Sequence, residues 1–334
     1  MKIAVIGAGA IGNLVAGYLK QSDEDVSLIG RRSSVEAIKK SGLRISGVRG
    51  DLWVKVDVSE RLFEAPEMVV LAVKTQDINE ALKSNSKFLQ ESILVTTQNG
   101  IQADSLVSGY IPIEHIVSSI VMFGATYGEP ARVVHNFEGD WIIGKMCNDN
   151  DEAVVKVQGV LNKIFPTHIS SNIRGMKYLK VFVNANNCIP AILGVSMQEA
   201  FRDLAISRIS IALWEEGIKL VNQSGTPLVS LPNFPVERLT QLTSMQIDEA
   251  AKIFSGIMVN LSKEPLYGSI LQSIKRGRPS EIDYINGEFV RLAADHNISA
   301  PLNKRMVELV HEVERTGRFF TKQELISETV NFIQ

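Results

Sequence analysis

Cysteine is scarce in this sequence: Cys147 and Cys188 are the only two among 334 residues. Two distant cysteines supply neither the even, closely spaced set of a disulfide-stapled fold nor the paired spacing of a metal site. This scarcity is typical of a reducing compartment, so we expect a cytoplasmic protein with no bound metal.

Long apolar runs and an excess of one charge are also missing. No stretch of about 18 apolar residues predicts a membrane span. The 35 basic residues nearly balance the 37 acidic ones, so the chain has no electrostatic footprint for nucleic acid or an anionic membrane. The apolar start MKIAVIGAGAIG could be a signal peptide, but its glycines and the charged run QSDEDV fit a strand and turn better. These absences favour chemistry on a small molecule.

The first half of the chain does contain short β-branched runs that alternate with helix-like segments. This alternation is typical of a parallel sheet buried on both faces. The expected strands cover 2–6, 26–29, 68–73, 93–97 and 116–121, with an inserted hairpin over 44–58 and a second strand pair over 131–144. A helix over 151–165, broken by Pro166, follows them.

Beyond about residue 170 the strand runs disappear and helical apolar spacing takes over. The chain is also longer than the size at which one core usually stops growing, so two domains are expected. We predict a Rossmann-type, doubly wound α/β domain over 1–170 and an all-α domain over 171–334. The expected helical segments cover 173–195, 198–223, 235–262, 281–296 and 302–315.

The segment GAGAIG follows the first expected strand directly and opens the first expected helix. In a G-x-G-x-x-G motif the first glycine permits the tight turn, the second lets the backbone approach a pyrophosphate, and the third lets helix and strand pack closely. Free N–H groups at the helix start would bind the pyrophosphate. An ordinary glycine-rich turn is the alternative, but the βαβ context favours a dinucleotide site formed by Gly7, Ala8, Gly9, Ala10, Ile11 and Gly12.

The end of the second expected strand indicates which dinucleotide binds. An NAD enzyme usually has an acid about 20 residues after the glycines to accept the ribose hydroxyls. Here the chain reads GRRSS from Gly30 to Ser34, with Arg31 directly after the glycine. Guanidinium groups and hydroxyls suit a 2′-phosphate, which an acid would repel. We therefore predict NADP, the alternative being a solvated surface turn.

Two further polar residues stand at expected strand ends. Lys74 follows MVVLAV, and Asn99 follows ILVTT one residue after Gln98. Ligands of open parallel sheets bind at the carboxyl ends of the strands. Either residue could be an ordinary cap or turn residue, but their paired position favours a role in binding.

In the expected helix over 173–195, the spacing stacks Lys180, Asn184 and Cys188 on one face at i, i+4 and i+8. A lysine in so apolar a segment should be costly unless it is paired or faces a cleft. The alternative is that Lys180 reaches solvent by its long stem while the asparagines bridge helices. In RPSEIDYING, Ser280 is a plausible N-cap, which puts Glu281 in a first helical turn, where acids are common for dipole reasons alone.

These features in this order resemble the ketopantoate reductase (2-dehydropantoate 2-reductase) family over essentially the whole chain. The most specific parts are IRGMKYLKVFVNA (173–185) and GSILQSIKRGRPSEIDYING (268–287). The resemblance implies NADPH-dependent reduction of ketopantoate to pantoate in pantothenate biosynthesis. It implies that Lys180 is the general acid, and that Glu281 helps to hold substrate and cofactor. It further implies cofactor contacts for Arg31, Lys74, Asn99 and Glu281, and substrate contacts for Asn99, Asn184 and Ser269, with Cys188 at another substrate-side position.

This chemistry agrees with the residues themselves. A ketone that accepts hydride develops alkoxide charge, so a cation with a transferable proton should stand near its oxygen. With a reference pKa of about 10.4, a lysine is protonated at neutral pH. A nearby carboxylate such as Glu281 would favour the charged form of Lys180.

The sequence departs from the family pattern on the substrate side. Cys188 stands where a second asparagine is usual, Met197 and Gln198 replace an Asn-Gly pair, and Leu266 replaces an asparagine three residues before Ser269. Three interpretations stay open: a ketopantoate reductase with altered contacts, for example through Asn187; a reductase of another 2-oxo acid; or an NADP-binding sensor without turnover. Retention of Lys180 and Glu281 argues against the sensor. A redox role for Cys188 is less favoured than a core position. The long helices of the second domain could form a homodimer face.

Overall fold

The computed structural model describes residues 1–146 and 149–333, so Cys147 lies outside the described residues. The chain divides into two compact units, Met1–Arg174 and Gly175–Gln334. This division falls a few residues after the expected boundary at 170. Within the described ranges, no helix is both long enough and apolar enough to cross a membrane.

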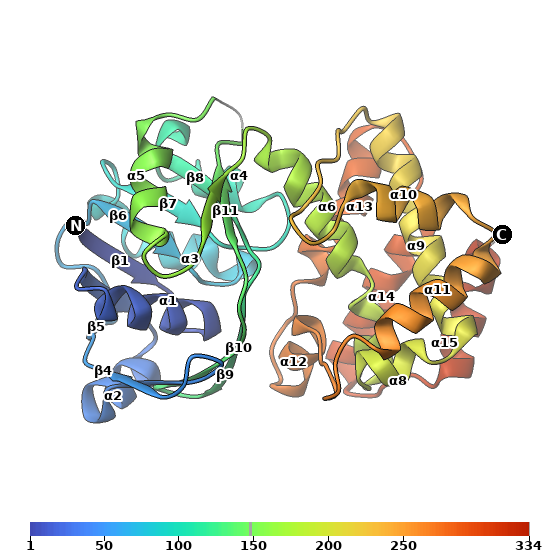
Figure 1. The fold of residues 1–334 in the computed structure, drawn as a ribbon, viewed down its shortest axis with the longest axis horizontal. Coiled ribbons are helices and arrows are strands. Elements are labelled where there is room, and N and C mark those ends of the chain that lie inside the picture. The colour runs from blue at the N-terminus through green and yellow to red at the C-terminus, as the bar shows by residue number, and fades with distance from the viewer. Residues whose placement is uncertain (147–148, 334) are drawn as a thin grey trace. The chain divides into compact units, whose positions relative to one another are not determined.

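The first unit is built on an eight-stranded, mostly parallel sheet with the order β12-β11-β8-β7-β6-β1-β2-β5 (Figure 1). β11 runs antiparallel to β8. The strands are β1 (Lys2–Ile6), β2 (Asp25–Ile29), β5 (Asp57–Ser59), β6 (Met68–Leu71), β7 (Ile93–Thr96), β8 (Ile116–Val121), β11 (Trp141–Gly144) and β12 (Thr167–Ile169). The helices of this unit are α1 (Ala10–Gln21), α2 (Arg32–Ser41), α3 (Ile78–Lys83), α4 (Ala103–Val107) and α5 (Glu152–Leu161).

Strand β1 shows that the sheet is covered on both faces. Ile3 and Val5 belong to one buried apolar cluster, and Ala4 and Ile6 belong to another. Successive side chains of a strand point to opposite faces, so each cluster fills one side of the sheet. Residues of α1 and α5 complete the first cluster, and residues of α3 and α4 complete the second. The structure thus confirms the expected Rossmann-type α/β fold.

A second, four-stranded sheet has the order β4-β3-β10-β9, formed by β3 (Leu43–Gly47), β4 (Leu52–Val54), β9 (Gly124–Glu129) and β10 (Arg132–Phe137). The antiparallel pair β3–β4 confirms the expected hairpin. The expected strand pair over 131–144 is wrong, because β10 pairs with β3 and β9 whereas β11 pairs with β8 and β12. β10 alternates buried and exposed residues, but all four residues of β11 are buried. A strand with every residue buried fits a sheet covered on both faces, and β11 lies in the eight-stranded sheet.

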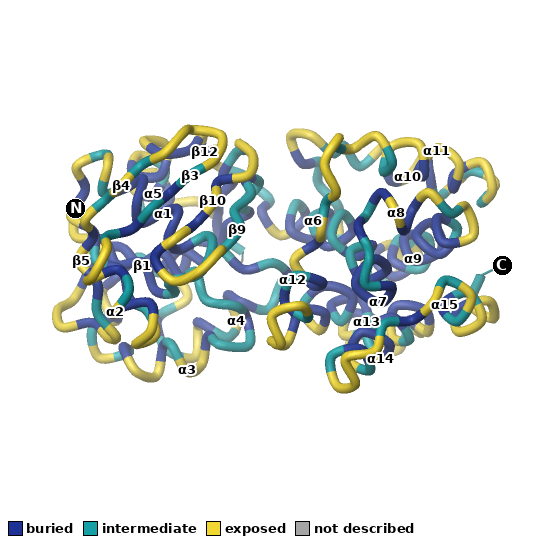
Figure 2. The backbone as a smooth tube through the Cα atoms, turned by 90° about the horizontal axis from the view of Figure 1, so that it is seen from below, coloured by how far each residue is buried: buried dark blue, intermediate teal, exposed yellow. Residues whose placement is uncertain are grey.

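The described part of the second unit consists of helices and their connections, which Figure 2 shows with dark blue inner segments and yellow outer loops. The long helix α9 contacts α8, α10, α11, α13, α14 and α15. Its Trp214 packs edge-to-face on Phe254 and donates its indole N–H to the carbonyl of Phe182 (2.8 Å). The helices are α6 (Ile173–Ala185), α7 (Cys188–Leu193), α8 (Met197–Phe201), α9 (Leu204–Gln223), α10 (Val236–Ser244), α11 (Ile247–Val259), α12 (Ser269–Lys275), α13 (Asn286–Asp295), α14 (Pro301–Thr316) and α15 (Lys322–Thr329).

The expected continuous helix over 173–195 is wrong, because α6 ends at Ala185 and α7 begins at Cys188. Pro190 explains the break: it has no N–H for the carbonyl of Asn186, and its ring would clash with that carbonyl in a continuous helix. The chain instead makes two hydrogen bonds that each span three residues, from Asn187 N–H to the Asn184 carbonyl (2.9 Å) and from Ile189 N–H to the Asn186 carbonyl (3.2 Å).

Three other expected helical segments are each divided in two. The segment 198–223 contains α8 and α9, and 235–262 contains α10 and α11. The segment 281–296 contains a short 3₁₀ turn, η4 (Ile282–Tyr284), followed by α13. Glu281 therefore precedes the 3₁₀ turn instead of lying in the first turn of an α-helix.

Candidate active site

The glycine-rich turn between β1 and α1 is tightly packed at two of its three glycines. Gly7 has a φ of +116°, and a Cβ added there would lie 2.6 Å from the backbone carbon of Ala72. A Cβ added to Gly12 would lie 1.8 Å from the carbonyl oxygen of Gly7, whereas one added to Gly9 would meet nothing within 4 Å. Two positions thus exclude a side chain for reasons of packing, and Gly9 leaves space for an approaching ligand.

The start of α1 at this turn suits an anion. Gly9 is its N-cap, and no side-chain cap bond or first-turn acid occupies the helix end. The first N–H groups of a helix lack intrahelical acceptors and attract negative charge. The turn therefore fits the pyrophosphate of a dinucleotide. The buried Asn13 also supports the turn by donating to the carbonyl of Ala8 (3.1 Å), a contact that the motif alone did not indicate.

The end of β2 lies against the same turn. Gly7 N–H donates to the carbonyl of Ile29 (2.8 Å), and a Cβ on Gly30 would lie 2.7 Å from the Cβ of Ala8. The next residue, Arg31, has a side chain 64% exposed and pairs with Asp77 (3.4 Å). Such an exposed pair is weak, so the Arg31 guanidinium can be shared with a ligand phosphate.

The other polar residues of the GRRSS segment differ from Arg31. Arg32 pairs with Glu36 of its own helix at 2.8 Å. Ser34 is buried, and its hydroxyl lies 3.4 Å from that of Tyr127. Of the two arginines, Arg31 is thus the one placed directly at the strand end.

Lys74 and Asn99 lie at equivalent points beyond two neighbouring strands. In the parallel pair β6–β7, Leu71 is opposite Thr96, and each polar residue follows three positions later. The buried side chain of Gln98 fixes this edge, because its Nε2 donates to the carbonyls of Leu71 and Val73, both at 2.8 Å. Sequence reasoning identified Lys74 and Asn99, both half-buried, but missed Gln98, which was visible only as the residue before Asn99.

In the second unit, Lys180 and Asn184 lie one turn apart on α6, and both are half-buried. Part of the surface of Lys180 is exposed, yet burial of its ammonium group lowers its pKa to about 8. A neighbouring carboxylate would act in the opposite direction. The expected electrostatic support of the charged form by Glu281 therefore does not outweigh burial. An amine with this pKa is still mostly protonated at neutral pH and gives up its proton more readily than an exposed lysine.

Cys188 is a core residue. Its exposed fraction is 0%, and burial raises the pKa of its thiol, beside which lies the side chain of Asn286. It starts α7 and is thus not part of the α6 face that carries Lys180 and Asn184. The thiol has no exposed surface in this conformation, and the expected substrate contact of Cys188 stays a prediction.

The remaining positions that depart from the family pattern lie together. Met197 N–H donates to the carbonyl of Leu266 (2.9 Å). The buried carboxamide of Gln198 donates to the carbonyls of Ser262 and Glu264, and accepts from Leu266 N–H (3.0 Å). A Cβ added to Gly268 would lie 3.2 Å from Asn187 and 3.3 Å from Met197. Gln198 thus has a structural role, because its side chain holds the segment 262–266 by hydrogen bonds. Asn187 and Met197 lie next to Gly268, which precedes Ser269, the exposed first residue of α12.

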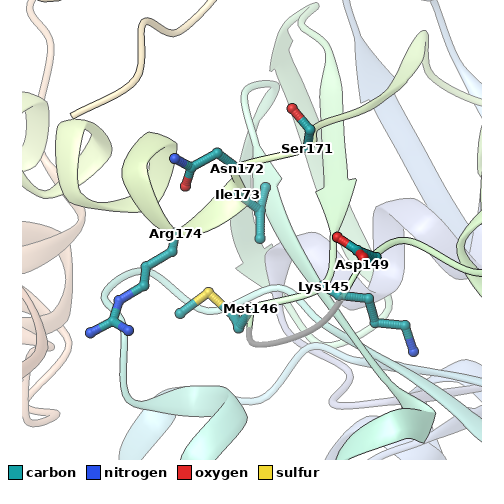
Figure 3. A pocket seen from close by; sticks show the side chains of 7 residues that line it. All are labelled: Lys145, Met146, Asp149, Ser171, Asn172, Ile173 and Arg174. Atoms are coloured by element: carbon teal, nitrogen blue, oxygen red, sulfur yellow. The ribbon is translucent and has the colours of Figure 1, made fainter. Parts of the chain in front are cut away.

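A polar depression in the first unit is separate from these residues. It is lined by Lys145, Met146, Asp149, Ser171, Asn172, Ile173 and Arg174 (Figure 3). The amine of Lys145 is already engaged by the Asp151 carboxylate (3.3 Å), and Figure 3 shows the side chains of Lys145 and Arg174 pointing away from each other. The side chains of Lys145 and Arg174 therefore do not converge on a common position for a ligand. In the described residues, no group of three His, Cys, Asp or Glu could hold a metal ion.

Comparison with known proteins identifies the family. The ketopantoate reductase PanE/ApbA family matches residues 3–148, and its C-terminal domain matches 172–314. The 2-dehydropantoate 2-reductase of Pyrococcus horikoshii is 32% identical over 95% of this chain and 99% of its own length. That of Pyrococcus abyssi is 33% identical over 91% of this chain and 94% of its own length.

Solved structures share the fold. A ternary structure of D-mandelate dehydrogenase with NADH and anilino(oxo)acetate covers 95% of this chain and 99% of its own, with a TM-score of 0.81 at 24% identity. The PanE/ApbA family ketopantoate reductase of Ralstonia eutropha JMP134 covers 94% and 99%, with a TM-score of 0.79 at 23% identity. The matches to both domains and the two Pyrococcus relatives show that this chain belongs to the ketopantoate reductase family of oxidoreductases.

Proposed function

We propose that this chain reduces 2-dehydropantoate to pantoate with NADPH, and that Lys180 supplies the proton. The observation that carries the proposal is the half-buried Lys180, whose pKa burial lowers to about 8, on the helix that also carries Asn184. Membership of the family and the names of the Pyrococcus relatives support the substrate. When bound, the dinucleotide supplies a hydride to the carbonyl carbon, and the carbonyl oxygen takes a proton.

The roles of the chain's own residues follow from charge and position. As hydride reaches the carbonyl carbon, negative charge grows on the oxygen, and the Lys180 ammonium stabilises this charge and transfers its proton. The turn from Gly7 to Gly12 binds the pyrophosphate through helix N–H groups. At the sheet edge, Lys74 and Asn99 contact the nicotinamide half and the substrate. We assign further substrate contacts to Asn184, Ser269 and Glu281.

A second candidate is reduction of another 2-oxo acid by the same residues. It is favoured by the cluster of Asn187, Met197 and Gly268 beside Ser269. In this neighbourhood, Met197 and Leu266 stand at positions where the family usually has asparagine. The D-mandelate dehydrogenase structure with NADH and anilino(oxo)acetate shares the fold. The assays should therefore include aromatic 2-oxo acids as substrates and NADH as a cofactor.

A steady-state assay of the pure protein with NADPH against a panel of 2-oxo acids tests both candidates. We expect ketopantoate to give the highest kcat/KM. A higher value for another 2-oxo acid would favour the second candidate. If NADPH binds but no acid is reduced, the enzyme proposal fails and a sensor role replaces it.

We expect a preference for NADPH that depends on Arg31. Charge-assisted hydrogen bonds to phosphate are strong, so Arg31→Ala should lower kcat/KM for NADPH by about 10- to 100-fold and change that for NADH much less. Arg32→Ala is the matched control, because Arg32 pairs with Glu36. Equal kcat/KM for the two cofactors in the unaltered protein would contradict the NADP assignment.

A further inference from the structure

The turn that carries Glu281 is attached to α14 by two acidic residues and a histidine. Ser280, directly before Glu281, donates its backbone N–H to Oε1 of Glu314 (2.7 Å). The other oxygen of the same carboxylate lies 3.0 Å from Nδ1 of His311. The second ring nitrogen of His311, Nε2, lies 2.9 Å from Oδ1 of Asp283. We call Glu314, His311 and Asp283 the α14 clamp.

The α14 clamp holds the backbone on both sides of Glu281. Glu314 fixes the residue before it, and Asp283, two residues after it, is tied to the same helix through His311. Within the turn, Ser280 Oγ accepts the N–H of Ile282 (3.3 Å), and Ile282 is fully buried. Glu281 itself is half-buried, so its carboxylate extends from a backbone anchored at both neighbours.

The geometry of His311 requires a proton on each ring nitrogen. A neutral imidazole has one N–H, so it can donate to only one of the two carboxylates and presents a lone pair to the other. The imidazolium donates to both and also carries the positive charge that the two anions favour. Both bonds of the α14 clamp are therefore made only when His311 is charged.

We propose that Glu314 and His311 are positioning residues that hold Glu281 for substrate and cofactor, and that this hold loosens when His311 loses its proton. The inference rests on the role of Glu281 in the proposed function. The groups that face His311 are Asp283 from η4 and Glu314 from its own helix. Glu281 would thus be presented rigidly while His311 is protonated and less rigidly once His311 has lost its proton.

Electrostatics agree with this geometry. Burial lowers the pKa of His311, but the hydrogen bonds and charges of Asp283 and Glu314 outweigh burial, so the pKa is raised above its ordinary value of 6.5. A group with a raised folded-state pKa stabilises the fold fully below its unfolded pKa and loses that effect as pH rises through the folded pKa. The clamp should therefore be complete below about pH 6.5 and open above the folded pKa of His311.

The clamp can be tested without activity, by amide hydrogen exchange over residues 278–285 and by NMR titration of His311. Exchange, corrected for its intrinsic pH dependence, should accelerate as His311 loses its proton in the unaltered protein. Glu314→Ala removes the acceptor of Ser280 N–H, so exchange should be fast at every pH. Glu314→Gln keeps an oxygen acceptor but lowers the His311 pKa. His311→Gln should abolish the pH dependence. Glu312→Gln, on the same helix outside the clamp, is the matched control.

Activity then tests whether the clamp positions Glu281. With the best 2-oxo acid, Glu314→Ala and His311→Gln should lower kcat/KM by about tenfold, as expected for a misplaced binding group. Glu314→Gln should retain most activity at low pH. Unchanged exchange in Glu314→Ala and His311→Gln would overturn the clamp, and faster exchange with unchanged kcat/KM would overturn its positioning role. If the unaltered protein reduces no 2-oxo acid, the proposed function fails, whereas exchange and titration still decide whether the clamp exists.

Discussion

Lys180→Ala should lower kcat for carbonyl reduction by about 10²- to 10⁴-fold, the usual contribution of a positioned general acid. The developing alkoxide would lose the ammonium group assigned as its proton donor and would need a proton from water. The effect should fall on kcat more than on KM, because a proton donor acts mainly in the transition state. Lys219→Ala, at an exposed position of α9, is the control. A kcat close to that of the unaltered protein would remove Lys180 as the acid.

The pH dependence gives a second measure of Lys180. Because burial lowers its pKa to about 8, the amine loses its proton as pH rises through this value, and kcat for reduction should fall there. Oxidation of the hydroxy acid needs the neutral amine as base, so its rate should rise over the same range. His311→Gln should leave the fall of kcat near pH 8 unchanged, which distinguishes the titration of Lys180 from that of the α14 clamp.

Thermal stability distinguishes the catalytic role of Lys180 from any contribution of its ammonium group to folding. Its folded-state pKa lies below its unfolded value of 10.5, so the folded state disfavours the charged form. The unfolded chain then binds more protons between the two pKa values, and stability rises with pH across that window. Below it, the buried charge costs free energy. Lys180→Met should therefore keep or raise the Tm at neutral pH while abolishing activity, and a lower Tm would show that the ammonium group stabilises the fold.

Local patterns predicted the parts of this structure that depend on local chemistry. The run KIAVI followed by GAGAIG was enough to identify β1, the turn and α1, because one continuous segment carries both the burial and the glycines. Lys180 and Asn184 were correctly placed one turn apart because both precede the end of α6. Cys188 was misplaced because extrapolation by helical spacing ignored Pro190.

Contacts between distant segments could not be predicted in the same way. Glu314 lies 34 residues from Ser280, and nothing local indicates that its carboxylate accepts that N–H. Gln98 was visible beside Asn99, but its bonds to Leu71 of β6 and to Val73 just beyond that strand depend on the pairing of β6 with β7. The separation of β10 from β11 was in principle readable, because the first alternates and the second is continuously apolar.

Gly12→Ala and Gly9→Ala should damage the dinucleotide turn in different ways. A Cβ at Gly12 would lie 1.8 Å from the carbonyl oxygen of Gly7, and a backbone group cannot move aside without displacing β1 or α1. We expect a loss of about 1–3 kcal/mol or more in stability, a lower Tm and weak NADPH binding. A Cβ at Gly9 meets nothing within 4 Å, and its φ of −90° suits any residue. That variant should keep the Tm of the unaltered protein but bind NADPH more weakly, because the methyl group occupies the approach of the pyrophosphate.

Gly159→Ala in α5 is the control for both variants, since its added Cβ also meets nothing within 4 Å and lies inside a helix, where alanine is favoured over glycine by about 0.5–1 kcal/mol. It should raise the Tm slightly and leave NADPH binding unchanged. Thermal unfolding without cofactor and fluorescence titration with NADPH measure the two effects separately. If Gly9→Ala binds NADPH as tightly as Gly159→Ala does, the pyrophosphate does not pass over Gly9. The space at that glycine would then need another explanation, because packing does not require it.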